Sequence, residues 1–429
     1  MQEAFLHFIW KHQYFDKNDL ATTNGDFLEI FDQGFLQTDA GPDFSQCRIK
    51  IADITWSGNI EVHVRSGAWL HHHHDDDKAY DNVVLHVVWE NDKTICRTDG
   101  TEIPVLELKN RVSIELLNKY NKLINQPYQI PCQDQFHLVS DIKKLGMADK
   151  TMLNRLERKA KEVSELLDLS GGNWEEVAYR LLCRNFGFKI NNHAFDQLAK
   201  ALPLKYIHKH SNDLVQVEAL LLGQSGFLDA KLADTYYVQL QKEYKFLAQK
   251  YQLHEYKLSK HQWKFLRLRP ANFPTLRLAQ LAVLLSKLKN VFSAFIDSTS
   301  LDQLSEQFDI KTSEYWCTHY HFDNESEKRI KKLGKSSVEN LIINTVIPIL
   351  AAYSKLHGEQ IYMDRAIELL HQLKPESNKI IKVWKDLNLP ISNAFDSQST
   401  IEWHNEFCLK RKCLNCNVGV HILMKSEKS

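Results

Sequence analysis

The spacing of hydrophobic residues changes part-way along this chain of 429 residues, and this change constrains the fold more than any other feature. Up to about residue 110, short runs rich in Val, Ile and Phe are separated by Gly, Asp, Asn and Pro, as is typical of strands. These runs cover residues 27–31, 47–51, 60–64, 83–89 and 103–108. From Met147 onward, apolar residues recur at helical spacing.

We therefore predict an α/β domain over residues 1–135, with a mixed sheet and flanking helices. A mainly α-helical domain follows over residues 141–429, and it carries a cysteine cluster near its end. The boundary lies in the polar segment 126–141, which contains Pro127 and Pro131.

Acidic residues gather early in the chain, where residues 16–43 hold seven acidic side chains and one basic one. This run ends in Gly41-Pro42-Asp43. Seventeen residues separate Asp43 from Glu61, which stands in Ile60-Glu61-Val62-His63-Val64. On a strand, Glu61 and His63 point to the same face. A plainer interpretation stays open, because Gly-Pro-Asp also marks ordinary turns and the alternating run suits any half-solvated strand.

This arrangement resembles the nuclease superfamily named for its PD...(D/E)xK pattern, and His63 stands where that superfamily usually has Lys. The resemblance implies a restriction-endonuclease-like fold for the first domain. It also implies that Asp43 and Glu61 hold Mg²⁺ or Mn²⁺, with Glu29 as an additional candidate ligand. His63 would then orient or deprotonate the attacking water.

A run of four histidines and three aspartates, His71 to Asp77, follows that strand. Imidazole and carboxylate both suit Zn²⁺ and Mn²⁺, although consecutive residues cannot all reach one ion. If the run is a short helix, it would line the same cleft as Glu61 and His63. The alternative is a solvated polar loop. His86, within the apolar run 80–89, is expected to be a hydrogen-bonded core residue.

Basic residues concentrate between residues 241 and 290, with eleven Lys or Arg against two Glu. The whole chain balances 54 basic against 54 acidic residues, so this concentration is local. Interleaved aromatic residues would suit phosphate contacts combined with base stacking. The residues expected to bind nucleic acid are Lys260, Trp263, Lys264, Arg267 and Arg269. The alternative is a solvated helix face whose aromatic residues belong to the core.

Three cysteines cluster near the end of the sequence as Cys408-x4-Cys413-x2-Cys416. Thiolates at this spacing suggest bound Zn²⁺ or an iron–sulfur cluster. A fourth ligand would come from His404, His421 or the distant Cys317. Three reduced cysteines without a metal are the alternative.

Several strings resemble an uncharacterised bacterial family, domain of unknown function 2851. They are residues 38–44, 58–63, 79–88 and 269–274, together with the three clustered cysteines. The resemblance implies a bacterial cytoplasmic protein and no established activity. The longest uncharged stretch, residues 340–354, is shorter than the about 20 residues of a membrane span, and we expect no membrane partner.

The leading functional hypothesis is a metal-dependent nuclease that uses Asp43, Glu61 and His63, with nucleic acid as partner. One alternative is a non-catalytic nucleic-acid-binding or assembly protein on the same fold, which the replacement of Lys by His63 favours. Another is a hydrolase with a transition-metal site in residues 71–77.

Overall fold

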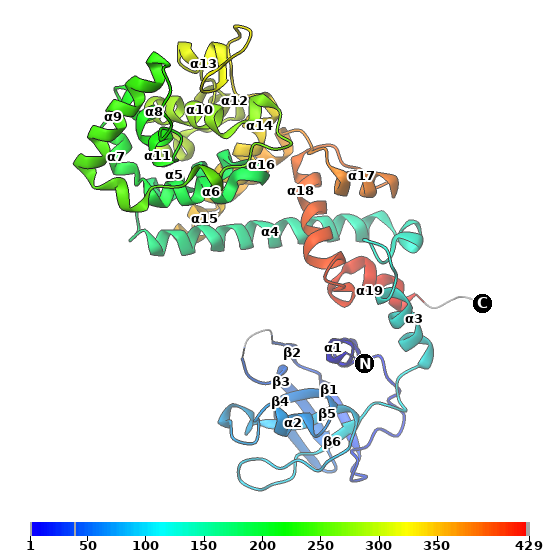
Figure 1. Ribbon diagram of the computed structural model, residues 1–429. Helices are drawn as coiled ribbons and strands as arrows, with labels where there is room; N and C mark the ends of the chain where they lie inside the picture. Colours follow the sequence, from blue (N-terminus) through cyan, green and yellow to red (C-terminus); the bar gives the residue numbers. More distant parts are fainter. Residues whose placement is uncertain (1, 38–39, 426–429) are drawn as a thin grey trace. The chain divides into compact units, whose positions relative to one another are not determined.

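Strands occupy the early part of the chain and helices most of the rest, as the hydrophobic spacing predicts (Figure 1). The computed structural model describes residues 2–37 and 40–425, so Thr38 and Asp39 of the family strings lie outside the described residues. Contacts divide the chain into two units. The sheet unit is Met1–Met147 with Trp403–Ser429, and the helical unit is Ala148–Glu402.

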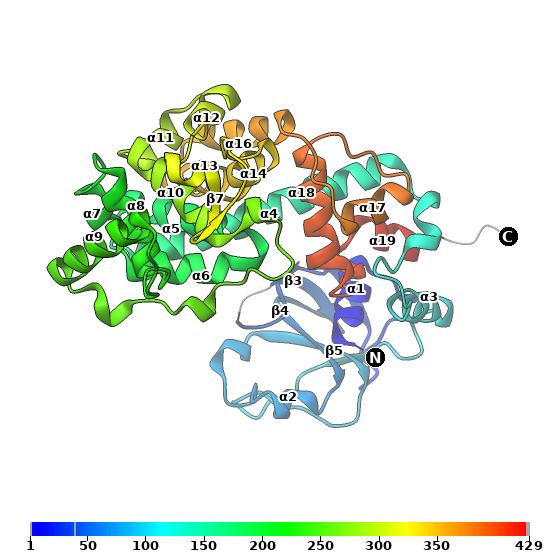
Figure 2. The ribbon, with the colours of Figure 1, turned by 45° about the horizontal axis from the view of Figure 1, so that its top comes forward.

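The segment after residue 402 differs from the prediction, which placed everything from 141 to 429 in one helical domain. It belongs with the sheet unit, because α19 (Asn417–Met424) packs against α3 (Ile114–Ile124) and the Asn417 backbone N–H donates to Met147 Sδ. Figure 2 shows these two helices near each other. The chain therefore passes from the sheet unit to the helical unit after residue 147 and returns to the sheet unit after residue 402.

The sheet unit contains a six-stranded mixed sheet in the order β1-β3-β4-β5-β6, with β2 paired to β3 (Figure 1). Neighbours from β1 to β4 are antiparallel, whereas β4–β5 and β5–β6 are parallel. Its further elements are α1 (Glu3–His12), β1 (Leu28–Asp32), β2 (Phe35–Leu36), β3 (Phe44–Ile51), β4 (Ile54–Arg65), α2 (Ala68–His71), β5 (Val83–Glu90) and β6 (Val105–Glu107).

Strands β4 and β5 lie in the middle of the sheet, and β5 is buried from Val83 to Val88. Helix α1 packs on β4. Parallel central strands are covered on both faces, so residues 60–63 of β4 are all buried despite their alternating polarity. Glu61 and His63 are consequently enclosed, at 4% and 1% exposure, and not on a half-solvated strand face.

The helical unit has one large apolar core, to which most of its helices contribute. Its elements are α4 (Asp141–Leu169, which begins in the sheet unit), α5 (Trp174–Phe186), α6 (Phe188–Ala201), α7 (Leu204–His208), α8 (Leu214–Gln224), α9 (Thr235–Tyr251), α10 (Pro274–Lys287), α11 (Val291–Asp297), α12 (Leu301–Gln307), α13 (Glu314–Thr318), β7 (His319–His321), β8 (Asn324–Glu325), α14 (Lys335–Leu341), α15 (Ile347–His357), α16 (Gln360–Gln372), α17 (Lys379–Asp386) and α18 (Ala394–Glu402).

One helical stretch, Lys335–His357, is long and apolar enough to cross a membrane by length and composition. The bent pair Pro274–Lys287 and Val291–Asp297 passes the same test only if it is taken as one span. In the first stretch, 61% of the apolar window is buried inside the unit, which accounts for its composition as a core helix.

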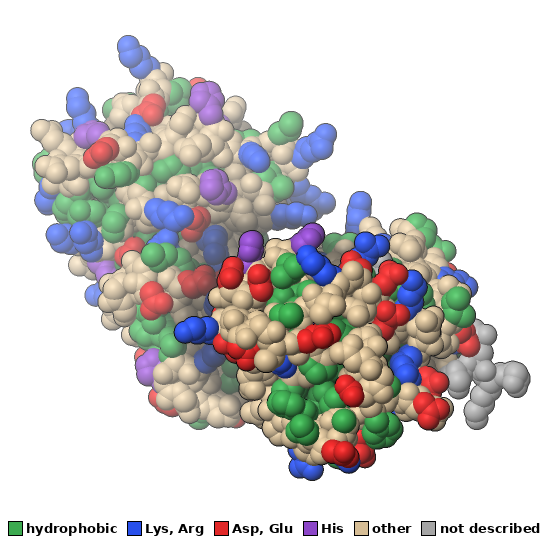
Figure 3. Space-filling view, turned by 90° about the horizontal axis from the view of Figure 1, so that it is seen from below, with side chains coloured by type: hydrophobic (Ala, Val, Ile, Leu, Met, Phe, Trp, Pro, Cys, Tyr) green, Lys and Arg blue, Asp and Glu red, His purple; other side chains and the backbone are tan. Residues whose placement is uncertain are grey.

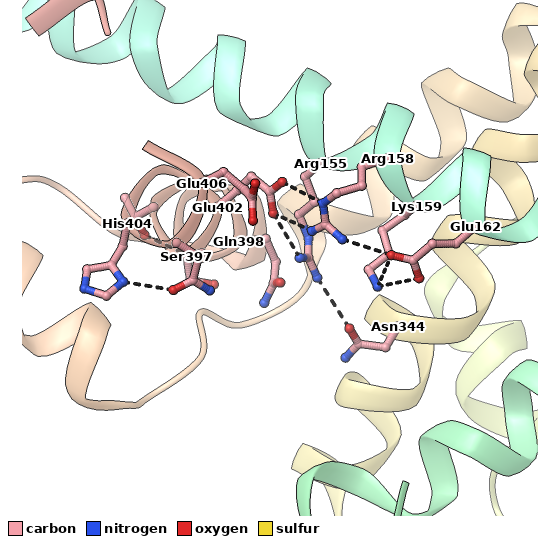
Figure 4. Close-up of polar contacts among 12 residues, drawn as sticks. Arg155, Arg158, Lys159, Glu162, Asn344, Ser397, Gln398, Glu402, His404 and Glu406 are labelled. Atoms are coloured by element: carbon pink, nitrogen blue, oxygen red, sulfur yellow. Dashed lines mark hydrogen bonds and ion pairs between the residues drawn. The ribbon is translucent and has the colours of Figure 1, made fainter. Parts of the chain in front are cut away.

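A partly buried ion-pair network joins three parts of the helical unit (Figure 4). Arg158 of α4 forms a two-point contact with Glu402 of α18, with Nε–Oε1 at 3.0 Å and Nη2–Oε2 at 2.7 Å. Arg155 lies 3.8 Å from the same carboxylate and donates to the Asn344 side chain at 3.4 Å. The network ties the first long helix of the unit to its last.

On the face shown in Figure 3, acidic and basic side chains are interspersed, with hydrophobic side chains between them. This mixture agrees with the equal numbers of basic and acidic residues in the chain.

The buried carboxyl of Glu218, on α8, should make the stability of the helical unit depend on pH. The carboxyl is fully buried, and burial raises its pKa to about 7, although Tyr236, Trp316 and Ser313 donate hydrogen bonds to it. The native state therefore keeps this proton at pH values where the unfolded chain releases it. Unfolding free energy should fall by on the order of 2 kcal/mol between pH 4.5 and pH 7.

Chemical denaturation of the full chain across this pH range measures the effect. Glu218→Gln should flatten the decline, and Glu157→Gln, an exposed change on α4, should not. A parent and a Glu218→Gln variant with the same pH dependence would show that Glu218 is not the group responsible.

Candidate metal centre

Strand pairing brings Asp43 and Glu61 together. Phe44 of β3 pairs with Ile60 of β4, so Asp43, just before β3, lies beside Glu61. The Asp43 backbone N–H donates to Glu61 Oε2 at 3.0 Å, and the Val62 backbone N–H donates to Asp43 Oδ2 at 3.0 Å. Two backbone donors therefore hold the two carboxyl groups in place.

Three imidazoles meet beside this acidic pair. The ligand nitrogens of His63, His72 and His74 all lie within 4.8 Å of one another. His63 Nε2 is 3.2 Å from His72 Nδ1 and 3.6 Å from Glu61 Oε1, while His74 Nε2 is 3.4 Å from that oxygen. Strand β4 and the segment after α2 thus direct four side chains to one point.

The backbone after α2 determines which histidines of the run take part. Helix α2 ends at His71, and His73 adopts a left-handed conformation at φ 58°, which turns the chain back. The His74 backbone N–H donates to Trp69 O at 3.1 Å, and its ring stacks on Tyr80 at 3.8 Å. His72 and His74 therefore face His63, whereas His71 and His73 are exposed and lie outside the group of three.

The loop that carries these histidines is anchored by a small apolar cluster. Trp69, Tyr80, Val83, Ile95 and Ile103 are buried together beneath it. In the same loop Asp77 accepts a hydrogen bond from Ala79 N at 2.9 Å and caps a short 3-10 helix. Asp77 thus has a structural role, and the group of converging ligand atoms takes only histidines from this run.

His86 orients His63, since His63 Nδ1 lies 2.9 Å from His86 Nε2 across the parallel pair β4–β5. The prediction that His86 is a hydrogen-bonded core residue therefore holds for its Nε2. Its Nδ1 is buried without a hydrogen-bond partner among the described residues. Burial and the neighbouring histidines lower the pKa of His63 to about 2, and burial lowers that of His86 to about 3. Both rings are neutral, which is the metal-binding form.

Glu61 has the opposite shift. Burial, and then the neighbouring Asp43 carboxylate, raise its pKa to about 8. A bound cation would favour the ionised form of Glu61 while it coordinates the neutral imidazoles, so it would suit both kinds of group at once.

His7, which the sequence analysis did not select, reaches the site from α1. Its Nε2 lies 3.1 Å from Asp43 Oδ2, and the two side chains are 23% and 22% exposed. Burial opposes protonation of His7, but Asp43, Glu3 and the Val62 backbone together outweigh it and raise the His7 pKa. A lone histidine in an apolar helix carries no signal in the sequence, so only the packing of α1 against β4 identifies it.

Three of the distances within the site are close to those between ligands of a single ion. Two ligands bound to a tetrahedral ion at 2.0–2.1 Å lie about 3.3 Å apart. The contacts among His63, His72, His74 and Glu61 are 3.2, 3.4 and 3.6 Å. Asp43 lies next to this group through Glu61. These side chains are the residues that could hold a metal.

Comparison with known families places this chain. The family model described as "Protein of unknown function (DUF2851)" matches residues 3–379. The chain belongs to the DUF2851 family. No curated protein and no solved structure matches the chain. The match confirms the family resemblance and covers the whole candidate centre, but it stops before Cys408, Cys413 and Cys416.

In this DUF2851 protein, Glu29 lies away from the site, contrary to its prediction as an additional ligand. It is exposed on β1 and pairs with Lys50, near the far end of β3 from Asp43. At about 3.3 Å per residue, the seven positions between Asp43 and Lys50 correspond to roughly 23 Å.

The basic segment of the DUF2851 protein lies in the helical unit. Lys260, Lys264, Arg267 and Arg269 are exposed, as phosphate contacts require. Trp263 is not available for base stacking, contrary to the prediction. It is 5% exposed, packs on Phe195 and Phe227, and donates from Nε1 to Ser225 O at 2.8 Å.

The three clustered cysteines of the DUF2851 protein are buried in the sheet unit, in and around two short helical segments and just before α19. Among the proposed fourth ligands, Cys317 belongs to α13 in the helical unit. His404 Nδ1 contacts the Asn405 side chain at 2.9 Å, and His421 lies on α19.

Proposed function

We propose that this protein is a metal-dependent nuclease that hydrolyses phosphodiester bonds. The convergence of Asp43 and Glu61 with three imidazoles, those of His63, His72 and His74, carries the proposal. Carboxylates and imidazoles that meet beside a central strand form a site suited to a divalent ion and an anionic substrate.

The order of elements supports the resemblance to the PD...(D/E)xK superfamily. Helix α1 precedes three antiparallel strands, β1, β3 and β4, and α2 then leads to β5, which is parallel to β4. Asp43 stands at the start of one strand and Glu61 within the next, as in a restriction-endonuclease-like core. His63 remains the departure from the pattern.

We assign the metal to His63, His72, His74 and Glu61. An ion held there would make a bound water nucleophilic near neutral pH and would neutralise charge on a scissile phosphate. Three imidazoles favour Mn²⁺ or Zn²⁺ over Mg²⁺, which prefers oxygen ligands. His63 is then a ligand and not a base, because His86 and His72 occupy the vicinity of both its ring nitrogens.

Asp43 and His7 form a second, partly exposed pair in the site. Protonated His7 places a positive charge beside Asp43, where it can contact a phosphate oxygen or donate a proton to the leaving oxygen. The Asp43 carboxylate can orient a water molecule toward the phosphate. These two residues would contact the substrate, while His63, His72 and His74 hold the ion.

The exposed basic segment is the proposed nucleic-acid contact. Changing Lys260 or Lys264 to alanine should weaken binding of DNA at all sequences alike, and should reduce the slope of log affinity against log salt by about 1 for each phosphate that the protein no longer neutralises. Fluorescence anisotropy at several salt concentrations measures both quantities. Lys382→Ala, an exposed change on α17, is the matched control. Unchanged slopes in both segment variants would remove this segment from the interface.

The direct test incubates the full chain with single-stranded, duplex and branched DNA and with RNA, in Mn²⁺, Zn²⁺ or Mg²⁺. We expect cleavage that a chelator abolishes and that Asp43→Ala loses, while Asp76→Ala, an exposed change in the nearby loop, retains it. If no substrate is cut, or if Asp43→Ala cuts as fast as the parent, the nuclease proposal is wrong.

The two alternatives are outcomes of the same experiment. Binding of nucleic acid without metal-dependent cleavage would indicate a non-catalytic binding or assembly protein on this fold. The transition-metal hydrolase differs from the nuclease only in substrate, because His72 and His74 of the predicted run belong to the same centre as Glu61 and His63.

A further inference from the structure

Four buried cysteines, and not three, come together in the sheet unit. Cys132 precedes a short 3-10 helix at Gln133–Leu138, and it lies in the same unit as Cys408, Cys413 and Cys416. The exposed fractions of the four residues are 8%, 6%, 7% and 6%. The sequence places Cys132 far from the other three, because the whole helical unit separates them.

Cys132 lies against the C-terminal segment, because it lines one cavity together with His421 and Ile422 of α19. Burial raises the pKa of the Cys408 thiol, and the neighbouring thiols of Cys132, Cys416 and Cys413 raise it further. Burial likewise raises the pKa of Cys132, followed by Cys416 and Cys413. Arg411 acts in the opposite direction on Cys408 and Cys413.

The backbone around the thiols is built for close approach. The Arg411 guanidinium donates to Gln126 O and Tyr128 O at 2.8 and 2.9 Å, which fastens the C-terminal segment to the loop that leads to Cys132. Gly419 lies so close to this segment that a Cβ there would be 2.2 Å from Cys413 O. Only glycine can occupy this position without moving the cysteine loop.

A single metal ion would require the sulfur atoms of its ligands to lie close together. A tetrahedral Zn²⁺ with Zn–S of 2.3 Å holds its sulfurs about 3.8 Å apart. Within the described part of the chain, the three histidines make the one group of ligand atoms within 4.8 Å, and no three of these sulfurs do so. An iron–sulfur cluster spreads its four cysteines further apart than a single ion does.

We propose that Cys132, Cys408, Cys413 and Cys416 hold an iron–sulfur cluster. Each thiol releases its proton to solvent as its thiolate binds iron. Cys132 supplies the fourth ligand in place of His404, His421 or Cys317. The cluster fastens residues 403–425 to the sheet unit, and it is independent of the nuclease proposal.

The test measures iron, zinc and acid-labile sulfide in the full chain purified without oxygen and then supplied with iron and sulfide. We expect iron and sulfide in equal amounts, with a broad visible absorption that bleaches on reduction. Stoichiometric zinc in their place, or a chain that takes up neither metal, would overturn the proposal. This measurement requires no variant.

Two variants then identify the fourth ligand. Cys132→Ser should lose most of the iron and the visible absorption, whereas Cys317→Ser, in the helical unit, should keep the parent's content. Circular dichroism of both variants shows whether they fold. A folded Cys132→Ser protein with the parent's iron content would exclude Cys132 as a ligand. Loss of iron in Cys317→Ser would also contradict the assignment of Cys132 as the fourth ligand.

Discussion

Replacing His72 with alanine is expected to lower the affinity of the protein for Mn²⁺ by more than about a hundredfold, beyond the roughly 10–100-fold cost of losing an outer-shell partner. His72 Nδ1 lies 3.2 Å from His63 Nε2, so the change removes one of three converging imidazoles. His72 is exposed and outside the core, so the fold should not change. Isothermal titration calorimetry of the metal-free chain measures the affinity.

The run of four histidines supplies its own control. His71→Ala and His73→Ala change equally exposed neighbours that lie outside the group, and both should bind Mn²⁺ as the parent does. His74→Ala should behave like His72→Ala. Equal losses in all four variants would indicate a loose histidine-rich surface, and equal affinities would remove the proposed centre.

His86 extends this test to the residue that orients a ligand. His86→Ala should cost roughly 10–100-fold in affinity, because His63 loses the hydrogen-bond partner of its Nδ1. His86→Gln should restore part of the affinity, since its amide oxygen can accept that hydrogen bond. The partial rescue distinguishes orientation of His63 from a general loss of packing.

Replacing Glu402 with glutamine is expected to destabilise the helical unit by about 3 kcal/mol, at the lower end of the range for breaking a buried ion pair. The change removes the charge that compensates Arg158 and Arg155, and it leaves the Arg155 guanidinium, 12% exposed, inside the unit. The lower end applies because Arg158 is 41% exposed and can be solvated.

Urea denaturation of the full chain, followed by circular dichroism, measures this loss. Glu157→Gln on α4 is the matched control, because its exposed side chain should change the unfolding free energy by less than about 0.5 kcal/mol. An unchanged urea midpoint for Glu402→Gln would mean that the network contributes nothing to stability.

Much of the candidate centre could be predicted from the sequence, because its first residues are local. Asp43 and Glu61 lie on either side of one antiparallel turn, so strand pairing brings them together without help from the rest of the fold. The prediction that the run after this strand lines the same cleft was also right for His72 and His74. Which two histidines face inward depends on one left-handed residue, His73, and periodicity does not reveal that.

Other predictions failed where burial decides the role of a side chain. Trp263 stands among basic residues in the sequence, but its ring fills the helical core beside Phe195 and Phe227. Glu29 shares the acidic run with Asp43, but β3 separates them along its length. Both predictions relied on nearness in the sequence. Composition does not reveal which face of a helix or strand packs against the core.

The sequence by itself determined the succession of sheet and helices, the family, and the acidic pair with its histidine run, because these depend on local spacing and on neighbouring strands. Only the tertiary structure decided that His7 joins the site and that the segment after residue 402 returns to the sheet unit. It alone placed Cys132 in the unit of the three late cysteines, against α19. These contacts join residues far apart in the chain, and they exist only because packing of apolar faces fixes distant segments side by side.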